Sequence, residues 1–197
     1  MVVVQLEKAL DRVGVTFNQA ASAFQPLARS LLKEPSLFLS GLLLGVLAYG
    51  DNVVDEKAVS ACRALELLDQ GLRMAWSVTT DSNYDEDGLL VTDYLYGQAI
   101  DQVIEVGEPI VIGILARAIS ESAEAKISQR VSDHRTRLVV AALDIALCFG
   151  EFSAVTRDAI ESARRAASEP ASDFVGLLPA GAIRDFLRRA TSVVIAN

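Results

Sequence analysis

The stretch "DEKAVSACRALELLDQGLRMAW", residues 55–76, predicts the helix around which the rest of the chain packs. Asp55 stands immediately before its apolar pattern, where a carboxylate accepts a hydrogen bond from a backbone N–H of the first helical turn. We therefore expect a helix from Asp55 to about residue 78, at the centre of the core. Its apolar residues recur at three- and four-residue steps, close to one helical face: Ala58, Cys62, Leu65, Leu68 and Leu72.

The remaining apolar patterns also have a helical period, and we find no alternating stretch long enough for a β-strand. Pro35, Gly50, Gly107 and Pro109 divide them, because proline and glycine are frequent where helices begin and end. We expect one all-α domain over 1–197, an antiparallel bundle of about seven or eight helices. Besides the central helix, the expected ranges are about 3–32, 36–49, 89–107, 108–131, 134–150, 154–168 and 180–195.

The composition favours packed helices and argues against nucleic-acid binding. Apolar residues make up 51% of the chain and aromatic residues only 6%, so the core must be built mainly from Leu, Val, Ile and Ala. The net charge is −8, whereas a nucleic-acid surface needs clustered Lys and Arg. No basic residue occurs between Arg73 and Arg117, and the C-terminal third is rich in arginine. One end of the fold should therefore be electronegative.

Cysteine usage and hydropathy predict a cytoplasmic protein without a transmembrane segment. Cys62 and Cys148 lie in apolar helical patterns without a second Cys or His at ligand spacing, which predicts buried thiols. The first ten residues lack the pattern of a secretory signal. The uncharged run over 37–50 is shorter than the roughly 20 residues that span a membrane, so we expect a buried helix there. His134, the single histidine, is expected at a helix start.

The acidic stretch "TTDSNYDEDG", residues 79–88, suggests a calcium loop at first sight. When the loop is counted from Asn83, the twelfth position, which needs a bidentate Glu, is Tyr94. When it is counted from Asp81, the position that needs glycine is Glu86. The pattern favours a solvated loop, with Asp81, Asp85 and Asp87 as weak metal-ligand candidates. The acids of "DNVVDE", residues 51–56, are better explained as a loop and a helix cap.

Five stretches resemble, in order, the trans-polyprenyl diphosphate synthases, which have the all-α isoprenoid-synthase fold. Together they cover most of residues 36–195, and their order and spacing carry the resemblance. It implies an isoprenoid-synthase-like bundle that is shortened relative to the family. The stretches are "AVSACRALELLDQGLRMAW" from residue 58, "LLVTDYLYGQAIDQVIEVGEP" from 89, "ILARAISESAEAKISQ" from 114, "HRTRLVVAALDIALCFGEF" from 134 and "AIRDFLRRATSVVIAN" from 182.

The chain departs from the family at the residues that perform catalysis. The first aspartate-rich motif, DDxxD, which holds Mg²⁺ and the allylic diphosphate, falls on Trp76 to Thr80, where no carboxylate occurs. Only Lys33 and Pro35 correspond to residues of the motif that binds isopentenyl diphosphate. The second aspartate-rich motif is absent. Ionising a diphosphate ester needs bound cations and basic groups around the leaving group. The chain alone is therefore not expected to catalyse prenyl transfer.

The resemblance implies a non-catalytic small subunit of a heteromeric polyprenyl diphosphate synthase, which supports a catalytic subunit and helps to set product length in isoprenoid biosynthesis. Mg²⁺ is then expected in the catalytic partner. One alternative is a homodimeric module that binds an isoprenoid or another lipid without catalysis, and another is an enzyme with relocated metal ligands. The interface candidates, each of which could instead be core, are Leu72, Met74, Trp76, Leu90, Tyr94, Tyr96 and Ile100.

Overall fold

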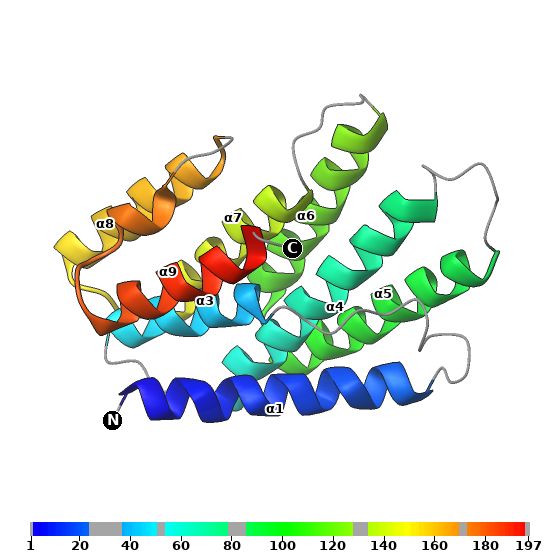
Figure 1. Cartoon of the computed structure of the whole chain (residues 1–197), viewed down its shortest axis with the longest axis horizontal. Helices are drawn as coiled ribbons and strands as arrows, with labels where there is room; N and C mark the ends of the chain where they lie inside the picture. The colour runs from blue at the N-terminus through cyan, green and yellow to red at the C-terminus, as the bar shows by residue number, and fades with distance from the viewer. Residues whose placement is uncertain are drawn as a thin grey trace.

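Every regular element that the structure describes is helical (Figure 1). The computed structural model describes residues 2–23, 37–50, 54–78, 86–127, 134–169 and 173–195. Within these ranges it has eight α-helices, two 3-10 helices and no β-strand, which confirms the all-α prediction. The elements are α1 (Val2–Ala23), α3 (Phe38–Leu47), η1 (Ala48–Gly50), α4 (Glu56–Val78), α5 (Glu86–Val106), α6 (Pro109–Ile127), α7 (His134–Phe149), α8 (Ala154–Ala167), η2 (Phe174–Leu177) and α9 (Ala182–Ile195).

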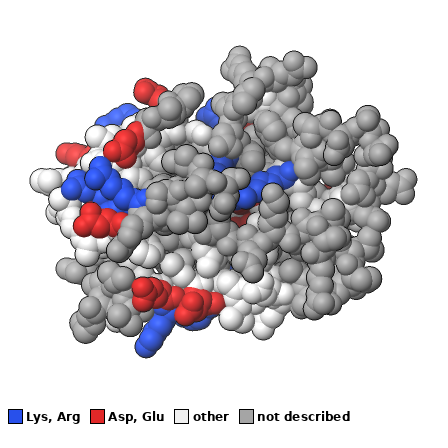
Figure 2. All heavy atoms as spheres, in the orientation of Figure 1, with Lys and Arg blue, Asp and Glu red and all other residues white. Residues whose placement is uncertain are grey.

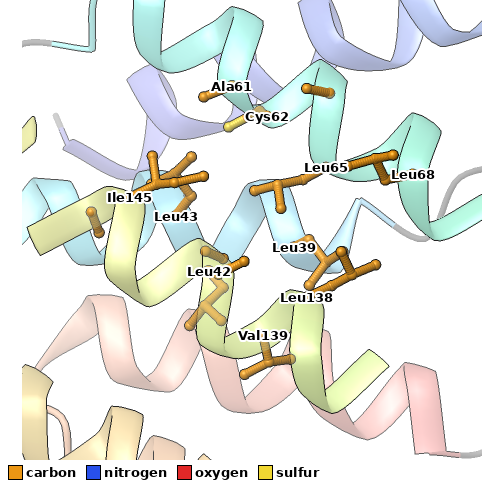
Figure 3. Packing of buried hydrophobic residues seen from close by; sticks show 14 of the residues in the cluster. Leu39, Leu42, Leu43, Ala61, Cys62, Leu65, Leu68, Leu138, Val139 and Ile145 are labelled. Carbon is orange, nitrogen blue, oxygen red and sulfur yellow. The ribbon is translucent and has the colours of Figure 1, made fainter. Parts of the chain in front are cut away.

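Helix α3 lies inside the bundle, and all ten of its residues are buried. It contacts α1, α4, α7 and α9, so its almost continuous apolar sequence has an apolar neighbour on every side. Figure 3 shows Leu39 and Leu42 of α3 beside Leu65 of α4 and Leu138 of α7. The prediction of a buried helix over this run is confirmed. None of the described helices is both long enough and apolar enough to cross a membrane.

Helix α4 is the central helix that the sequence predicts. It contacts α1, α3, α5, α6 and α7. Between Ala58 and Met74 only the arginines Arg63 and Arg73 are not buried, so the predicted apolar face is part of a helix that is enclosed nearly all round. The Asp55 carboxylate accepts a hydrogen bond from the Ala58 N–H at 2.9 Å, which confirms the predicted cap.

Most predicted helix boundaries lie within a few residues of the observed ones, but the predicted end of the acidic loop at Gly88 is wrong. Residues 79–85 of that loop lie outside the described residues. Helix α5 already begins at Glu86. In its first two turns the Gly88 carbonyl accepts a hydrogen bond from the Thr92 hydroxyl at 2.8 Å. Acidic residues are favourable at the positive N-terminal end of a helix, so the acidic stretch need not remain outside it. Gly107, at φ 70°, follows the last residue of α5, and Pro109 is the first residue of α6, as predicted.

Two further differences concern the ends of the chain. The predicted continuation of the first helix beyond Ala23, together with Pro35, lies outside the described residues. Near the C-terminus, α7, α8 and α9 agree with their predicted ranges to within two residues, whereas the short helix η2 was not predicted. A four-residue 3-10 helix leaves too short an apolar pattern to be recognised in a sequence.

Helices α4 and α5 run side by side and approach closely at Gly71 (Figure 1). A Cβ atom at Gly71 would lie 2.8 Å from the Tyr96 ring, whereas one at Gly113, in the exposed part of α6, would meet nothing within 4 Å. Glycine at position 71 therefore allows the two helices to pack at this distance.

We expect Gly71→Ala and Gly113→Ala to change stability in opposite directions. The first overpacks the contact with Tyr96 and should lower the free energy of unfolding by about 1–3 kcal/mol. The second adds helix propensity in open space and should raise it by about 0.5–1 kcal/mol. Urea unfolding followed by circular dichroism measures both. An equal gain in the two variants would show that α4 and α5 are not in close contact at Gly71.

Candidate functional site

The interface candidates on α4 are internal to this chain where the structure describes them. Leu72 and Met74 are 4% and 6% exposed and belong to the hydrophobic core. Their side chains pack inside the bundle, which is the alternative that the sequence left open. Trp76 belongs to the last turn of α4, but its side chain lies outside the described part.

The candidates on α5 divide between its two sides. Leu90 and Ile100 are 58% and 57% exposed, whereas Tyr94 and Tyr96 are half-buried. Ile104, which the sequence analysis did not single out, is 64% exposed on the same side as Leu90 and Ile100. The signal was present in its spacing, since Ile104 follows Leu90 by fourteen residues, or four helical turns. The opposite side of α5 is buried, and its apolar side chains are Val91, Leu95, Ala99, Val103 and Val106.

We call the exposed side the outer face of α5 and define it by Leu90, Asp93, Gly97, Ile100, Asp101 and Ile104. Apart from Gly97, it carries only large apolar and acidic side chains. Asp93 and Asp101 make no ion pair with a described residue. Burial and then the charge of Asp93 raise the pKa of the Tyr96 hydroxyl. The outer face therefore combines exposed apolar area with negative charge that the described neighbours do not balance.

The arginine-rich C-terminal part differs, because its arginines pair with nearby acids. Figure 2 shows Lys and Arg atoms next to Asp and Glu atoms over α8 and α9. Arg188 lies 3.2 Å from Asp173, and Arg164 forms a two-pronged pair with Asp144 of α7. The Arg164 pair thus holds α8 to α7, and the Arg188 pair holds α9 to the start of η2.

A buried polar cluster lies between α3, α4 and α7. Its centre is Glu66 of α4, which is 1% exposed. The Glu66 Oε1 atom accepts the backbone N–H of Ser40 at 3.0 Å and the Ser40 hydroxyl at 2.9 Å. Leu37, the residue before α3, provides no side-chain cap and has a left-handed backbone at φ 50°. Glu66 therefore caps the buried N-terminus of α3 from a different helix.

The second acid of the cluster, Asp69, is held by arginines. Its Oδ2 atom pairs with Arg73 one turn further along α4, and Arg135 of α7 lies 4.0 Å away. The Arg135 guanidinium also lies over the Phe38 ring, 5.6 Å from its centre. The two half-buried arginines give the buried Asp69 carboxylate partners of opposite charge, without which its burial would be costly. The sequence analysis did not recognise this cluster, although two acids within an apolar helix were a possible signal.

Burial, and to a smaller extent the charge of the neighbouring Asp69, raises the pKa of Glu66 to about 7, against the lowering effect of the Ser40 hydrogen bonds and of Arg135. The Glu66 Oε2 atom has no hydrogen-bond partner among the described groups. Since neither carboxylate reaches solvent, the cluster can hold helices together but cannot meet a diffusing substrate.

Titration of Glu66 should make the protein less stable as the pH rises from about 4.5 to about 7. Over that window the folded state keeps a proton that the unfolded chain, with its ordinary pKa of 4.5, releases. The raised pKa corresponds to a loss of roughly 3 kcal/mol, complete above pH 7. Glu66→Gln keeps an acceptor for Ser40 without titrating, so its urea midpoint should vary less with pH and exceed that of the wild type at pH 8.

Asp101→Asn, which removes an exposed carboxylate, is the matched control and should leave the pH dependence unchanged. If Glu66→Gln retained the full decline between pH 4.5 and 7, the titrating group would be another residue.

The proposed metal ligands are not brought together in the described part of the chain. Asp81 and Asp85 lie outside it, and Asp87 lies in the first turn of α5 with its side chain outside it. Among the described residues, no three His, Cys, Asp or Glu side chains lie close enough to hold a metal ion. Trp76, Ser77 and Val78, the described residues at the motif position, offer no carboxylate for Mg²⁺.

Hollows open on the surface of the described part, and two of them are bounded by charged residues. One of about 300 Å³ is lined by Leu47, Ile110 and Cys148 and by Lys57 and Glu108, whose charged groups are 2.6 Å apart. The other, of about 200 Å³, lies between α6, α7 and α8 and is lined by the charged residues Arg117, Glu121, Arg137, Asp144 and Arg164. Charged walls suit a polar surface groove better than the apolar cavity that an isoprenoid chain needs.

The two cysteines differ, although the sequence predicts that both are buried. Cys62 is fully buried in α4, as predicted, and burial holds the pKa of its thiol far above the usual range. Cys148 is exposed, so the prediction is wrong for this residue. It lies in the last turn of α7, beside the larger hollow, where the helix has neighbours on fewer sides. Partial burial and the charge of Asp144 still raise its pKa.

We expect one thiol of the native protein to react with a thiol reagent such as dithionitrobenzoate, and two after unfolding. The reactive residue should be Cys148, so Cys148→Ser should remove the native reaction. Its rate should increase through pH 8–9, because the thiolate is the reacting form. A native reaction that persists in Cys148→Ser would mean that α4 opens to expose Cys62.

No protein-family model matches this chain, and comparisons with curated proteins and with solved structures find no significant match.

Proposed function

We propose that this protein is a non-catalytic subunit of a heteromeric polyprenyl diphosphate synthase, which supports a catalytic subunit and helps to set the length of its product. The proposal rests on the resemblance of five successive stretches of the sequence to that family. The helices expected from those stretches occur in the same order along the chain, as α4, α5, α6, α7 and α9.

The observation that carries the non-catalytic part of the proposal is the end of α4. This is the helix that would present the first aspartate-rich motif, and Trp76, Ser77 and Val78 occupy its last positions. The carboxylates that α4 does place inside the bundle, Glu66 and Asp69, are engaged by Ser40 and by arginines. A diphosphate and its metal ions need carboxylates that are open to the site.

The exposed residues of α5 suit a subunit that acts by binding another protein. Leu90, Ile100 and Ile104 present apolar side chains on a helix whose other side is already packed on α4. Exposed apolar patches of this kind are frequent at protein interfaces. In this proposal, the chain contributes binding surface and shape to the complex, while the catalytic subunit contributes the Mg²⁺ site and the chemistry.

Co-expression with a catalytic polyprenyl diphosphate synthase of the same organism tests the proposal. The two chains should copurify, and the complex should make products of a different length from those of the catalytic subunit alone. Leu90→Glu should weaken the complex, whereas Val155→Glu, at an even more exposed apolar residue of α8, should leave it intact. Chain length is measured by chromatography of the dephosphorylated products.

Two results would contradict the proposal. The first is that no polyprenyl synthase of that organism binds the chain. The second is that the purified chain alone condenses isopentenyl and allylic diphosphates in the presence of Mg²⁺, since it would then have a catalytic site of its own.

A further inference from the structure

The hollow of about 200 Å³ between α6, α7 and α8 has an apolar lining in addition to its charged residues. Ala118 of α6 and Ala141 of α7 are buried in the hydrophobic core and form its base. The half-buried Ile114 and Val140, from the same two helices, extend this apolar lining. Pockets for drug-sized ligands begin at roughly 300 Å³, so a hollow of this size suits a smaller molecule.

The charges in the hollow do not cancel. Its two acids are already paired, since Glu121 of α6 lies 3.3 Å from Arg137 of α7. Asp144 of α7 accepts two hydrogen bonds from Arg164 of α8. Arg117, one turn before Glu121, is exposed and makes no ion pair with a described residue. Three arginines and two acids leave one positive charge, which is that of Arg117.

Arg137 has a hydrogen-bond donor left over beside this charge. Its pair with Glu121 uses the Nη1 atom. Its Nε atom is buried and has no hydrogen-bond partner among the described groups. A buried N–H without an acceptor is unfavourable, so an acceptor that enters the hollow would be stabilised there.

We propose that this hollow binds a small monocarboxylate. Its carboxylate lies between Arg117 and Arg137, and its apolar part lies on Ala118 and Ala141. The planar fork of a guanidinium matches the two oxygens of a carboxylate, as the pair of Arg164 with Asp144 already shows in the same hollow.

Both the charge and the lining favour a monocarboxylate over an inorganic anion. One negative charge balances the single positive charge that the paired residues leave, whereas a phosphate dianion would bring one negative charge too many next to Glu121 and Asp144. Phosphate also has no apolar part to cover Ile114 and Val140. A short apolar body removes this surface from water.

The proposal does not rest on the proposed function. Neither the outer face of α5 nor the end of α4 lines the hollow. Binding of a carboxylate is measured on the isolated chain, so failure of the co-expression experiment would leave it unaffected. Absence of carboxylate binding would equally leave the co-expression experiment unaffected.

Titration with isovalerate, a short branched monocarboxylate, is the direct test. At constant ionic strength and neutral pH, the amide NMR signals of Ala118 and Ala141 should shift and saturate. The dissociation constant should be on the order of 1–10 mM, because a small ligand in an open hollow makes few contacts. Isovaleramide has the same shape without the charge and should bind at least about tenfold more weakly.

Arg117→Gln should weaken isovalerate binding at least about tenfold, because it removes the charge that the paired residues leave. Arg117 is exposed, so the variant should remain folded. Arg165→Gln is the matched control, since Arg165 is also an exposed arginine but does not line the hollow. It should leave the affinity unchanged, whereas equal losses in the two variants would mean that only the net charge of the chain attracts the anion.

Three results would overturn the proposal. The first is that the signals do not saturate up to about 50 mM isovalerate, as would happen if the hollow accepted only an acidic side chain of another protein. The second is that inorganic phosphate or acetate binds as tightly as isovalerate, so that the apolar lining plays no part. The third is that Arg117→Gln retains the wild-type affinity.

Discussion

A helix that begins inside a protein must find acceptors for its free N–H groups, and here a carboxylate from another helix provides one. Helix α3 begins at Phe38 without a side-chain cap of its own, after a residue with a left-handed backbone. Glu66 of α4 accepts both the N–H and the hydroxyl of Ser40. A buried carboxylate without such hydrogen bonds is costly, so α3 and α4 are held in one relative position.

The layers of the bundle follow from this arrangement. Because α3 is enclosed, the helices α1, α4, α7 and α9 must cover it. Helix α4 is in turn covered by α5, whose inner side is apolar and whose outer face is left at the edge of the described bundle. The buried polar cluster and the outer face of α5 thus lie on opposite sides of the α4–α5 pair. The buried polar cluster holds α3, α4 and α7 in place, while the outer face of α5 is available for contacts with another chain.

The helices could be predicted from the sequence, whereas the buried polar cluster could not. The reason is that helix signals depend on neighbouring residues, while the cluster depends on contacts between residues far apart in the sequence. The cap at Asp55 and the break at Gly107 are local, so they could be predicted. Leu72 and Leu90 have similar helical spacing, yet one is buried and the other exposed, because spacing defines a face and not the helix that covers it. The burial of Glu66 depends on Ser40, twenty-six residues earlier, and could not be read from α4 alone.

The cap also has a consequence for the order of folding. Helix α3 has ten residues, fewer than an isolated helix needs to be stable in water. Its missing acceptor arrives only when α4 is in place, so the first turn at Ser40 cannot be completed before the two helices dock. Helices α3 and α4 should therefore form as one cooperative unit, although they are successive segments of the sequence. Their amide protons should exchange with solvent at similar rates.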